Sequence, residues 1–315
     1  MKFKKTLTVG IDRSKLDEDY WKMVNSLTEK IVALPKGSPD INTEIIDADC
    51  LLVAFGVTVD KETIGKAPNL KYIGVLAVAF GKIDTNYAKS KNITVCNCAG
   101  YSTEAVAEFV LSAILEHIRQ LEEGKRRGRN GNYSEAGISA TEIKNKIFGV
   151  IGLGSIGSRV AEIALGFGAD VRYWSRNRKE EAEKRGVKYT DADDLIGNAD
   201  FLSLNLAQTK DTEKFLNKER IEKIKKGAVV VNTAPMELVD IDALSERLAK
   251  GDITFILDHS DEMTEADLKK LSKHGNCIIY PPIAYVTKEA RMAKQEIFVG
   301  NIENFLNGSP TNKVN

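Results

Sequence analysis

The glycine-rich segment GLGSIG, residues 152–157, constrains the fold of this chain more than any other feature. The apolar run KIFGVI comes directly before it, and the amphipathic run SIGSRVAEIALGFG begins inside it. The spacing G-x-G-x-x-G is a weak signal alone, but between a buried strand and the start of a helix it is typical of a dinucleotide-binding βαβ unit. The run DVRYWS follows at the distance expected for the second strand. The sequence therefore predicts a phosphate-binding loop here.

Each glycine of this segment has its own physical task. Gly152 permits the tight turn after the strand, Gly154 lets a pyrophosphate approach the backbone, and Gly157 lets the helix and the strand pack closely. The helix N-terminus then presents N–H groups and the positive end of its dipole to the phosphates. We therefore expect a dinucleotide at this helix, and a chance glycine turn is the alternative.

The end of the second strand predicts which nucleotide is bound. A site for NAD carries Asp or Glu there, and the carboxylate accepts a hydrogen bond from the ribose 2′-hydroxyl. This chain has Ser175, Arg176 and Asn177 instead. A carboxylate would repel a 2′-phosphate, whereas these side chains can donate to one, with Arg176 as the charged group. The sequence predicts a preference for NADP over NAD; the alternative is an exposed basic loop that merely lacks the acid.

Short apolar strands alternate with short helices on both sides of the glycine-rich segment. Strands separated by helices indicate parallel sheets covered on both faces, so we expect an α/β fold with two doubly wound domains. A long helix with a wide apolar stripe, residues 102–124, stands between the two series. The expected strands are residues 6–11, 30–35, 50–56, 72–78 and 93–97 in the first series and 146–154, 170–175, 201–206, 228–233, 253–258 and 277–280 in the second.

Composition narrows the class of partner. Lysine plus arginine and aspartate plus glutamate both number 45, so neither nucleic acid nor an acidic membrane is favoured as the main partner. No apolar run is long enough to span a bilayer, and Asp12 interrupts the N-terminal apolar stretch before it could form a signal peptide. Four cysteines in 315 residues make no disulfide framework, and Cys96 and Cys98 are interpreted as core residues rather than metal ligands. We expect a cytoplasmic protein without a metal.

Several ordered motifs together resemble the D-isomer-specific 2-hydroxyacid dehydrogenase family, which includes glyoxylate/hydroxypyruvate reductases and phosphoglycerate dehydrogenases. The similarity extends over nearly the whole chain. VAFGKID resembles the substrate loop, ITVCNCAGYSTEAVAEFVLSAIL the entry to the interdomain helix, and FGVIGLGSIG the cofactor motif. LSLNLAQTKDT resembles the nicotinamide-side loop, with Asn205 where a histidine is common. GAVVVNTAPMELVDIDAL and ITFILDHSDEM resemble the strands of the catalytic arginine and the catalytic glutamate.

The resemblance implies a domain arrangement and a partner. A Rossmann cofactor domain, residues 101–284, would be inserted in a flavodoxin-like substrate domain, residues 1–100 plus 285–315. A homodimer would form through the interdomain helix and the basic, glycine-rich stretch 124–132. From its residues alone that stretch is interpreted as a solvated loop, with a subunit contact or an anion contact as the alternatives.

The family's chemistry depends on three side chains that this chain lacks. In the family, a hydride passes between C2 of the substrate and the nicotinamide, a histidine moves the hydroxyl proton, a glutamate tunes that histidine, and an arginine binds the substrate's carboxylate and carbonyl. Here Pro235 stands in place of the arginine, Met263 of the glutamate and Pro282 of the histidine, each within matching flanks. The resemblance therefore implies a member without the usual triad and with an apolar site floor, which suits a less charged substrate.

Other side chains are candidates for the missing roles. His259, beside Asp258, is the one histidine in an active-site motif and the best candidate proton donor; a loop histidine that points elsewhere is the alternative. Lys82 in the substrate loop could hold an anion, although a surface lysine is the simpler interpretation. Tyr280 and Tyr285 flank Pro282 and could donate a phenolic proton, although packing is the simpler interpretation of each.

The motifs that are intact imply contacts with the cofactor and the substrate. The residues concerned are Ser155 and Ile156 under the pyrophosphate, Thr212, Thr233 and Ala234 on the nicotinamide side, Asp258 as acceptor for the nicotinamide carboxamide, and Val78 and Ala79, whose backbone N–H groups would meet the substrate.

The sequence thus predicts an NADP-preferring oxidoreductase that transfers a hydride to a small carbonyl substrate by a proton route different from that of its relatives. A catalytically silent NADP-binding sensor, or a dimeric interaction protein, is the alternative from another class. An ordinary 2-hydroxyacid dehydrogenase comes third, because its arginine and histidine are absent.

Overall fold

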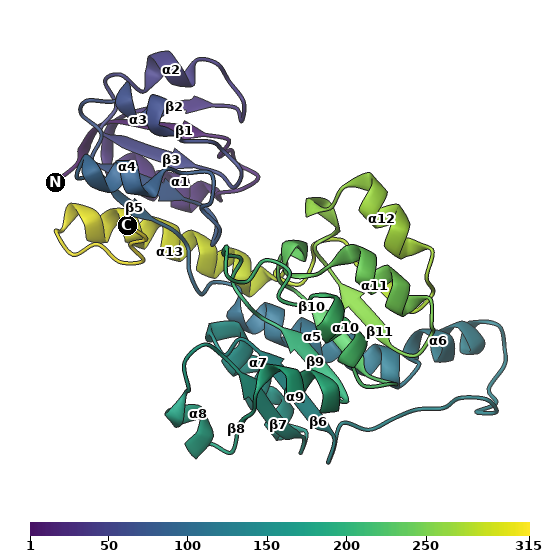
Figure 1. The fold of residues 1–315 in the computed structure, drawn as a ribbon. Coiled ribbons are helices and arrows are strands. Elements are labelled where there is room, and N and C mark those ends of the chain that lie inside the picture. The colour runs from purple at the N-terminus through teal and green to yellow at the C-terminus, as the bar shows by residue number, and fades with distance from the viewer. The chain divides into compact units, whose positions relative to one another are not determined.

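The structure, a computed structural model, describes residues 1–315 apart from the side chain of Glu262. The chain divides into unit 1, Met1–Ser102 with Thr287–Asn315, and unit 2, Thr103–Val286. Figure 1 shows the elements of each unit. The unit limits lie two residues beyond the domain limits given by the sequence motifs, at Ser102 and at Thr287.

Unit 1 contains a five-stranded parallel sheet with the order β2-β1-β3-β4-β5. This is the order of a flavodoxin-like doubly wound sheet, so the predicted fold of this half is confirmed. β3 ends three residues earlier than expected because Ala54 accepts a hydrogen bond from the N–H of Val57 and the chain turns there. The strands are β1 (Phe3–Val9), β2 (Thr28–Leu34), β3 (Cys50–Val53), β4 (Tyr72–Val75) and β5 (Thr94–Cys96).

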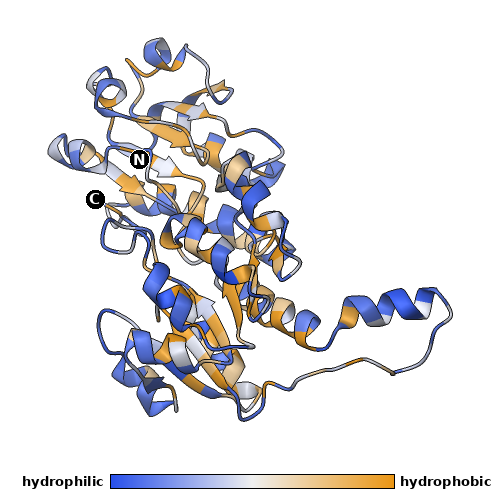
Figure 2. Cartoon of the chain, turned by 45° about the vertical axis from the view of Figure 1, so that its right-hand side comes forward, coloured by the Kyte–Doolittle hydropathy of each residue, from blue (hydrophilic) through white to orange (hydrophobic). Residues whose placement is uncertain are grey.

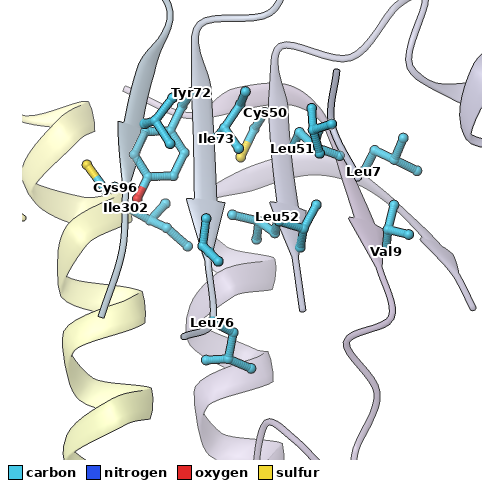
Figure 3. Packing of buried hydrophobic residues seen from close by; sticks show 14 of the residues in the cluster. Leu7, Val9, Cys50, Leu51, Leu52, Tyr72, Ile73, Leu76, Cys96 and Ile302 are labelled. Atoms are coloured by element: carbon cyan, nitrogen blue, oxygen red, sulfur yellow. The ribbon is translucent and has the colours of Figure 1, made fainter. Parts of the chain in front are cut away.

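The C-terminal helix α13 (Lys288–Leu306) completes the core of unit 1. Figure 3 shows Ile302 of this helix beside Tyr72 and Cys96 of the sheet, and all three are buried. Asn301 is also buried, and its side-chain amide donates to the carbonyl of Asn97 at 2.8 Å. These contacts explain why the last residues of the chain belong to the same unit as the first. The other helices are α1 (Glu18–Ser26), α2 (Ile41–Glu44), α3 (Lys61–Gly65) and α4 (Thr85–Ser90).

Unit 2 contains a seven-stranded sheet in which every neighbouring pair is parallel, with the order β12-β11-β10-β9-β6-β7-β8. The direction of winding reverses between β6 and β9, as in a Rossmann sheet, and this confirms the predicted fold of the second half. The short β8 lacks an apolar run and was not predicted. The strands are β6 (Ile147–Ile151), β7 (Asp170–Trp174), β8 (Lys188–Tyr189), β9 (Phe201–Leu204), β10 (Val229–Asn232), β11 (Thr254–Leu257) and β12 (Cys277–Ile279).

Helices cover this second sheet. The α5 helix (Thr103–Ile118) packs against α7 (Ser155–Gly166), which follows the glycine-rich segment. The remaining helices are α6 (Leu121–Arg129), α8 (Glu180–Lys184), α9 (Ala192–Asn198), α10 (Lys218–Lys223), α11 (Ile241–Leu248) and α12 (Glu265–Ser272), with the 3-10 turns η1 (Met236–Leu238) and η2 (Ser260–Glu262).

The prediction of one helix over residues 102–124 followed by a basic loop was wrong. α5 ends at Ile118, Gln120 adopts a left-handed conformation with φ of 50°, and a second helix, α6, runs through the basic stretch. The carboxylate of Glu123 accepts from Arg126 and Arg127, at the three- and four-residue spacings that stabilise a helix. Figure 2 shows that α6 is strongly hydrophilic, and Figures 1 and 2 show it reaching away from the sheet of unit 2.

The four cysteines are buried and form no disulfide among the described residues. Burial raises the pKa of the Cys98 thiol to about 12, so this thiol is neutral at physiological pH. The interpretation of Cys96 and Cys98 as core residues is confirmed by their burial. Of the helices that the structure describes, none is both long enough and apolar enough to cross a bilayer.

Candidate active site

The glycine-rich segment forms a tight turn between β6 and α7. Gly152 has φ of 92°, and its N–H donates to the carbonyl of Trp174 at 2.8 Å. A Cβ on Gly157 would lie 2.0 Å from the carbonyl oxygen of Gly152, so only glycine allows this approach of the helix to the strand. A Cβ on Gly154 would meet no protein atom within 4 Å. The turn therefore leaves open space at Gly154 and none at Gly157, as a pyrophosphate cradle requires.

The first turn of α7 is chemically suited to an anion. Gly154 precedes the helix without any side-chain cap, and no acidic side chain stands in the first turn. Ser155 is exposed and Ile156 is half-buried against the core of unit 2. The N–H groups at this helix end therefore face an accessible position, where the helix dipole favours negative charge.

Arg176 is the accessible cation at the end of β7. Its guanidinium is 70% exposed and lies 3.9 Å from the carboxylate of Asp211, which is itself 83% exposed, so the pair holds it weakly. Arg178 instead forms an ion pair with Glu183, with its Nη2 at 2.5 Å from the carboxylate. Ser175 is buried, and its hydroxyl donates to the carbonyl of Asn177 at 2.5 Å. The loop thus holds Ser175 and Arg178 in place and leaves Arg176 available.

A buried asparagine shapes the end of β10. Asn232 is fully buried; its amide donates to the carbonyl of Ala234 at 2.9 Å, and its side-chain oxygen accepts from the N–H of Ala234 at 3.1 Å. These two bonds fix the turn that carries Thr233 and Pro235. Sequence reasoning did not assign Asn232 this role, although an Asn directly after a buried strand is a known turn signal.

The loop after β9 is held by its own hydroxyl groups. Thr212 is buried, accepts from the N–H of Thr209 at 2.8 Å and donates to the carbonyl of Ala207 at 2.8 Å. Asn205, at the start of this loop, donates to the hydroxyl of Ser203 at 2.9 Å. Its side-chain oxygen is buried and accepts no hydrogen bond from the described residues.

Asp258, directly after β11, is a buried carboxylate with one unsatisfied oxygen. It is 1% exposed, and its Oδ2 accepts from the N–H of Ala284 at 3.0 Å. Its Oδ1 accepts no hydrogen bond from any residue that the structure describes, and burial raises the pKa of the carboxyl. A buried acceptor without a donor is costly, so such an atom indicates a ligand that supplies the donor. The carboxamide of a nicotinamide has suitable N–H groups, and with the open turn at Gly154 these residues fit a nicotinamide dinucleotide.

His259 lies between the ends of β10 and β11. Its Nε2 is 3.1 Å from the carbonyl oxygen of Thr233 and 3.9 Å from Oδ1 of Asp258, and its Nδ1 is buried. The structure therefore brings His259, Asp258 and Thr233 together at the carboxyl ends of adjacent strands. In this conformation Nε2 is directed at the protein backbone, so donation to a substrate would require the ring to turn.

The two tyrosines near Pro282 differ. The hydroxyl of Tyr280 donates to Glu116 at 2.8 Å, its ring packs edge-on against Phe109, and burial raises its pKa to about 12. Tyr280 is therefore a packing residue. Tyr285 is 39% exposed. Pro235, Met263 and Pro282 are all half-buried, so the three family positions hold no ionisable group.

The candidate substrate residues of unit 1 lie on the loop after β4. Val78 is 43% exposed, and its carbonyl accepts from the side chain of Asn97 at 2.7 Å, a positioning contact that sequence reasoning missed. The N–H groups of Val78 and Ala79 make no hydrogen bond within the described part of the chain. Lys82 is exposed on the same loop.

Comparison with known proteins agrees with this geometry. The model described as "D-isomer specific 2-hydroxyacid dehydrogenase, NAD binding domain" matches residues 111–284. A hydroxypyruvate reductase of Blautia hydrogenotrophica is 32% identical over 307 residues, which cover 94% of this chain and 94% of that protein. The chain belongs to the D-isomer-specific 2-hydroxyacid dehydrogenase family. It is therefore a member of a family of oxidoreductases that act on CH–OH groups and bind a nicotinamide cofactor.

Solved structures show the same two-domain fold. A D-lactate dehydrogenase from Aquifex aeolicus, in complex with NAD and lactic acid, is 29% identical with a TM-score of 0.84 and covers 96% of each chain. An acyclic imino acid reductase, in complex with NADPH and D-Arg, is 26% identical with a TM-score of 0.86 and covers 98% of this chain and 100% of its own. Solved structures with this fold thus include one complex with NAD and one with NADPH.

Two glycine substitutions separate folding from cofactor binding. Gly157→Ala forces the contact with the Gly152 carbonyl and should lower the free energy of unfolding by about 1–3 kcal/mol. Gly154→Ala meets open space at ordinary φ, so we expect stability within about 1 kcal/mol of the wild type. It should nevertheless weaken NADPH binding about tenfold or more, because the methyl group takes the place of the pyrophosphate. Urea unfolding and fluorescence titration measure both; a Gly154→Ala protein with wild-type affinity would contradict the placement of the phosphates.

Proposed function

We propose that this chain is an NADPH-preferring reductase of a small carbonyl substrate, in which the proton does not come from the family's histidine. The end of β7 carries the proposal: residues 175–177 present an available cation, Arg176, and no carboxylate, and the exposed Asp211 from the loop after β9 holds Arg176 only weakly, at 3.9 Å. In helix α8, which follows the loop, Glu183 is held by Arg178 and by the hydroxyl of Tyr173 at 2.8 Å. A 2′-phosphate would gain a charge-assisted hydrogen bond here, whereas a ribose 2′-hydroxyl finds no acceptor carboxylate.

The residues of unit 2 divide the remaining work. Asp258 would accept from the carboxamide through its unsatisfied Oδ1 and so fix the nicotinamide ring, while Thr212, Thr233 and Ala234 line its position. The bound dinucleotide supplies the hydride for the substrate's carbonyl carbon. The carbonyl oxygen must then receive a proton, and Pro235, Met263 and Pro282 have none to give.

His259 is the proposed proton donor. An imidazolium beside Asp258 would give its proton to the developing alkoxide, and solvent would reprotonate the ring. The side chain of His259 is 23% exposed, and its Nε2 lies 3.1 Å from the carbonyl oxygen of Thr233, so the ring would rotate to present this nitrogen to a substrate. Lys82 and Tyr285 remain the other candidates of the sequence for the same role.

The lack of a proton donor at the three family positions also favours a second substrate class, protonated imines. An imine that is already protonated on nitrogen receives the hydride at carbon and becomes a neutral amine, so no proton donor is needed in that step. The imino acid reductase noted above, with 26% identity over 98% of this chain, is named for reactions of this type. Because the three family positions have no ionisable group, they suit an iminium substrate and disfavour a keto acid, whose carbonyl oxygen needs a proton.

The proposal also includes the cellular location and the oligomeric state of the protein. Four reduced, buried cysteines fit a cytoplasmic protein. The hydrophilic α6 helix, which reaches away from the sheet of unit 2, suits a contact with a second copy of the chain, so we propose a homodimer. A catalytically silent NADP sensor is the competing function, and it predicts nucleotide binding without turnover.

Cofactor preference is tested at Arg176. NADPH should bind more tightly than NADH, and Arg176→Ala should weaken NADPH binding by about 10- to 150-fold, the loss of a charge-assisted hydrogen bond worth roughly 1.5–3 kcal/mol. Binding of NADH should stay unchanged. Lys179→Ala is the matched control, because it removes a neighbouring charge whose side chain is exposed. Calorimetric titration of both nucleotides measures this, and equal affinities in the wild type would refute the preference.

Substrate class is tested with the family's ordinary acids. Glyoxylate, pyruvate and hydroxypyruvate should be reduced far below the ~10 s⁻¹ that is typical of enzymes, because no histidine protonates the alkoxide at position 282. The assay follows NADPH oxidation at saturating cofactor, with and without added ammonia or methylamine, which convert part of the acid to its imine. Turnover at ordinary rates without amine would show that Pro235 and Pro282 have been misread. A rise in turnover on adding amine would select the iminium class.

The proton donor is tested with His259→Gln. The glutamine amide can still donate to the Thr233 carbonyl, so we expect NADPH affinity to stay the same. Reduction of whichever aldehyde, ketone or keto acid the enzyme accepts should fall by about 10²–10⁴, the usual contribution of a general acid. His274→Gln is the control, since its ring contacts Ser245 at 3.0 Å elsewhere in unit 2. Equal turnover in the His259→Gln enzyme would exclude this donor, and no turnover by any variant, with NADPH still bound, would favour the sensor.

A further inference from the structure

A buried tyrosine of β7 is bonded to the far end of the loop that carries Arg176. Tyr173 is fully buried, and its strand is paired on both sides, with β6 and with β8. Its hydroxyl accepts a hydrogen bond from the N–H of Lys179 at 2.6 Å and donates one to the carboxylate of Glu183 at 2.8 Å. The body of the sheet therefore holds the end of the loop and the helix α8 that follows it.

The protonation states of the two side chains keep this contact in place. Burial raises the pKa of Tyr173, so its hydroxyl retains the proton that it donates. The guanidinium of Arg178, followed by the hydroxyl of Tyr173, lowers the pKa of the Glu183 carboxyl, which therefore remains a charged acceptor. Arg178 binds this carboxylate through Nε at 3.0 Å and through Nη2 at 2.5 Å, a bidentate pair that fixes its orientation.

The near end of the same loop is held as well. Ser175 is buried, and its hydroxyl donates to the carbonyl of Asn177 at 2.5 Å. Arg176 stands between the two held ends, 70% exposed and 3.9 Å from the exposed carboxylate of Asp211. A backbone that is already fixed loses less conformational entropy when its side chain binds a ligand. The loop thus presents a mobile guanidinium from a fixed backbone.

We propose that Tyr173 is a positioning residue for the choice of cofactor: its hydroxyl holds the loop after β7 in the conformation from which Arg176 binds the 2′-phosphate of NADPH. The inference rests on the proposed preference for NADPH. The hydroxyl acts through the loop and not on the nucleotide, because it is already bonded to Lys179 and Glu183. NADH has no 2′-phosphate and gains nothing from the position of Arg176, so the effect is specific to NADPH.

Tyr173→Phe removes the hydroxyl and keeps the buried ring. The fold should tolerate it, because Glu183 keeps its ion pair with Arg178 and the exposed Lys179 can bond to water. Affinity for NADPH should fall about 3- to 10-fold, as for the loss of one hydrogen bond, while affinity for NADH stays unchanged in calorimetric titration. Tyr189→Phe is the matched control: its ring packs edge-on against Tyr173 at 5.5 Å between centroids, and it should bind both nucleotides as the wild type does.

A double-mutant cycle separates positioning from a general effect on the fold. If Tyr173 acts through Arg176, Tyr173→Phe should weaken NADPH binding in the wild-type background and have no effect in the Arg176→Ala background. Equal losses in both backgrounds would overturn the proposal. Wild-type affinity of Tyr173→Phe for NADPH, or an equal loss of affinity for NADPH and NADH, would also overturn it.

Amide hydrogen exchange measures the hold on the loop without any nucleotide. The N–H of Lys179 should exchange about 3- to 10-fold faster in Tyr173→Phe, whereas the N–H of Thr190, which donates to the backbone carbonyl of Tyr173 at 2.9 Å, should keep its protection. Unchanged exchange at Lys179 would overturn the proposal. Failure of the proposed function is distinguishable: the wild type would then bind NADPH and NADH equally, which removes this role of Tyr173, while exchange at Lys179 would still depend on the hydroxyl.

Discussion

The close approach of α7 to β6 is the contact on which the rest of unit 2 depends. The backbone of Gly157 sits so near the Gly152 carbonyl that no Cβ fits between them, and this brings the helix N-terminus over the carboxyl end of the sheet. Since all seven strands run in parallel, the ends of β7, β10 and β11 open at the same edge. Arg176, Thr233 and Asp258 therefore reach one edge of the sheet from positions far apart in the sequence.

That edge is organised by buried polar groups rather than by charge pairs. Asn232 satisfies both of its amide groups on the turn it begins, whereas Asp258 leaves one carboxylate oxygen without a donor. The two residues therefore have different roles. The hydrogen bonds of Asn232 are complete and hold a turn, whereas the unsatisfied oxygen of Asp258 indicates the position of a ligand. The raised pKa of Asp258 has the same origin, because a carboxylate with one donor in a dry position gains little from being charged.

The sequence was sufficient for the fold and for the cofactor loop because their signals are local. Alternation of apolar strands and helices predicted both sheets, and the glycine spacing predicted the turn at Gly152. The break at Gln120 was missed because a left-handed residue within a helical pattern has no sequence signature when it is neither glycine nor asparagine. The role of Asn97 was missed for another reason: it depends on a partner, Val78, in a segment that it meets only in the folded unit.

The three family positions of unit 2 differ from the predicted cofactor residues of the same unit in what they offer a ligand. Proline at 235 and 282 and methionine at 263 leave unit 2 without an ionisable group at these three positions, whereas Asp258 in the same unit has a buried oxygen without a donor. The buried Oδ1 of Asp258 has no donor and lowers the stability of the fold unless a ligand donates to it. A protein that no longer bound a ligand here would gain nothing from keeping this carboxylate. A chain that keeps this unsatisfied carboxylate while it lacks the three ionisable side chains is better explained as a protein that still binds a nicotinamide cofactor than as one that has lost its ligand.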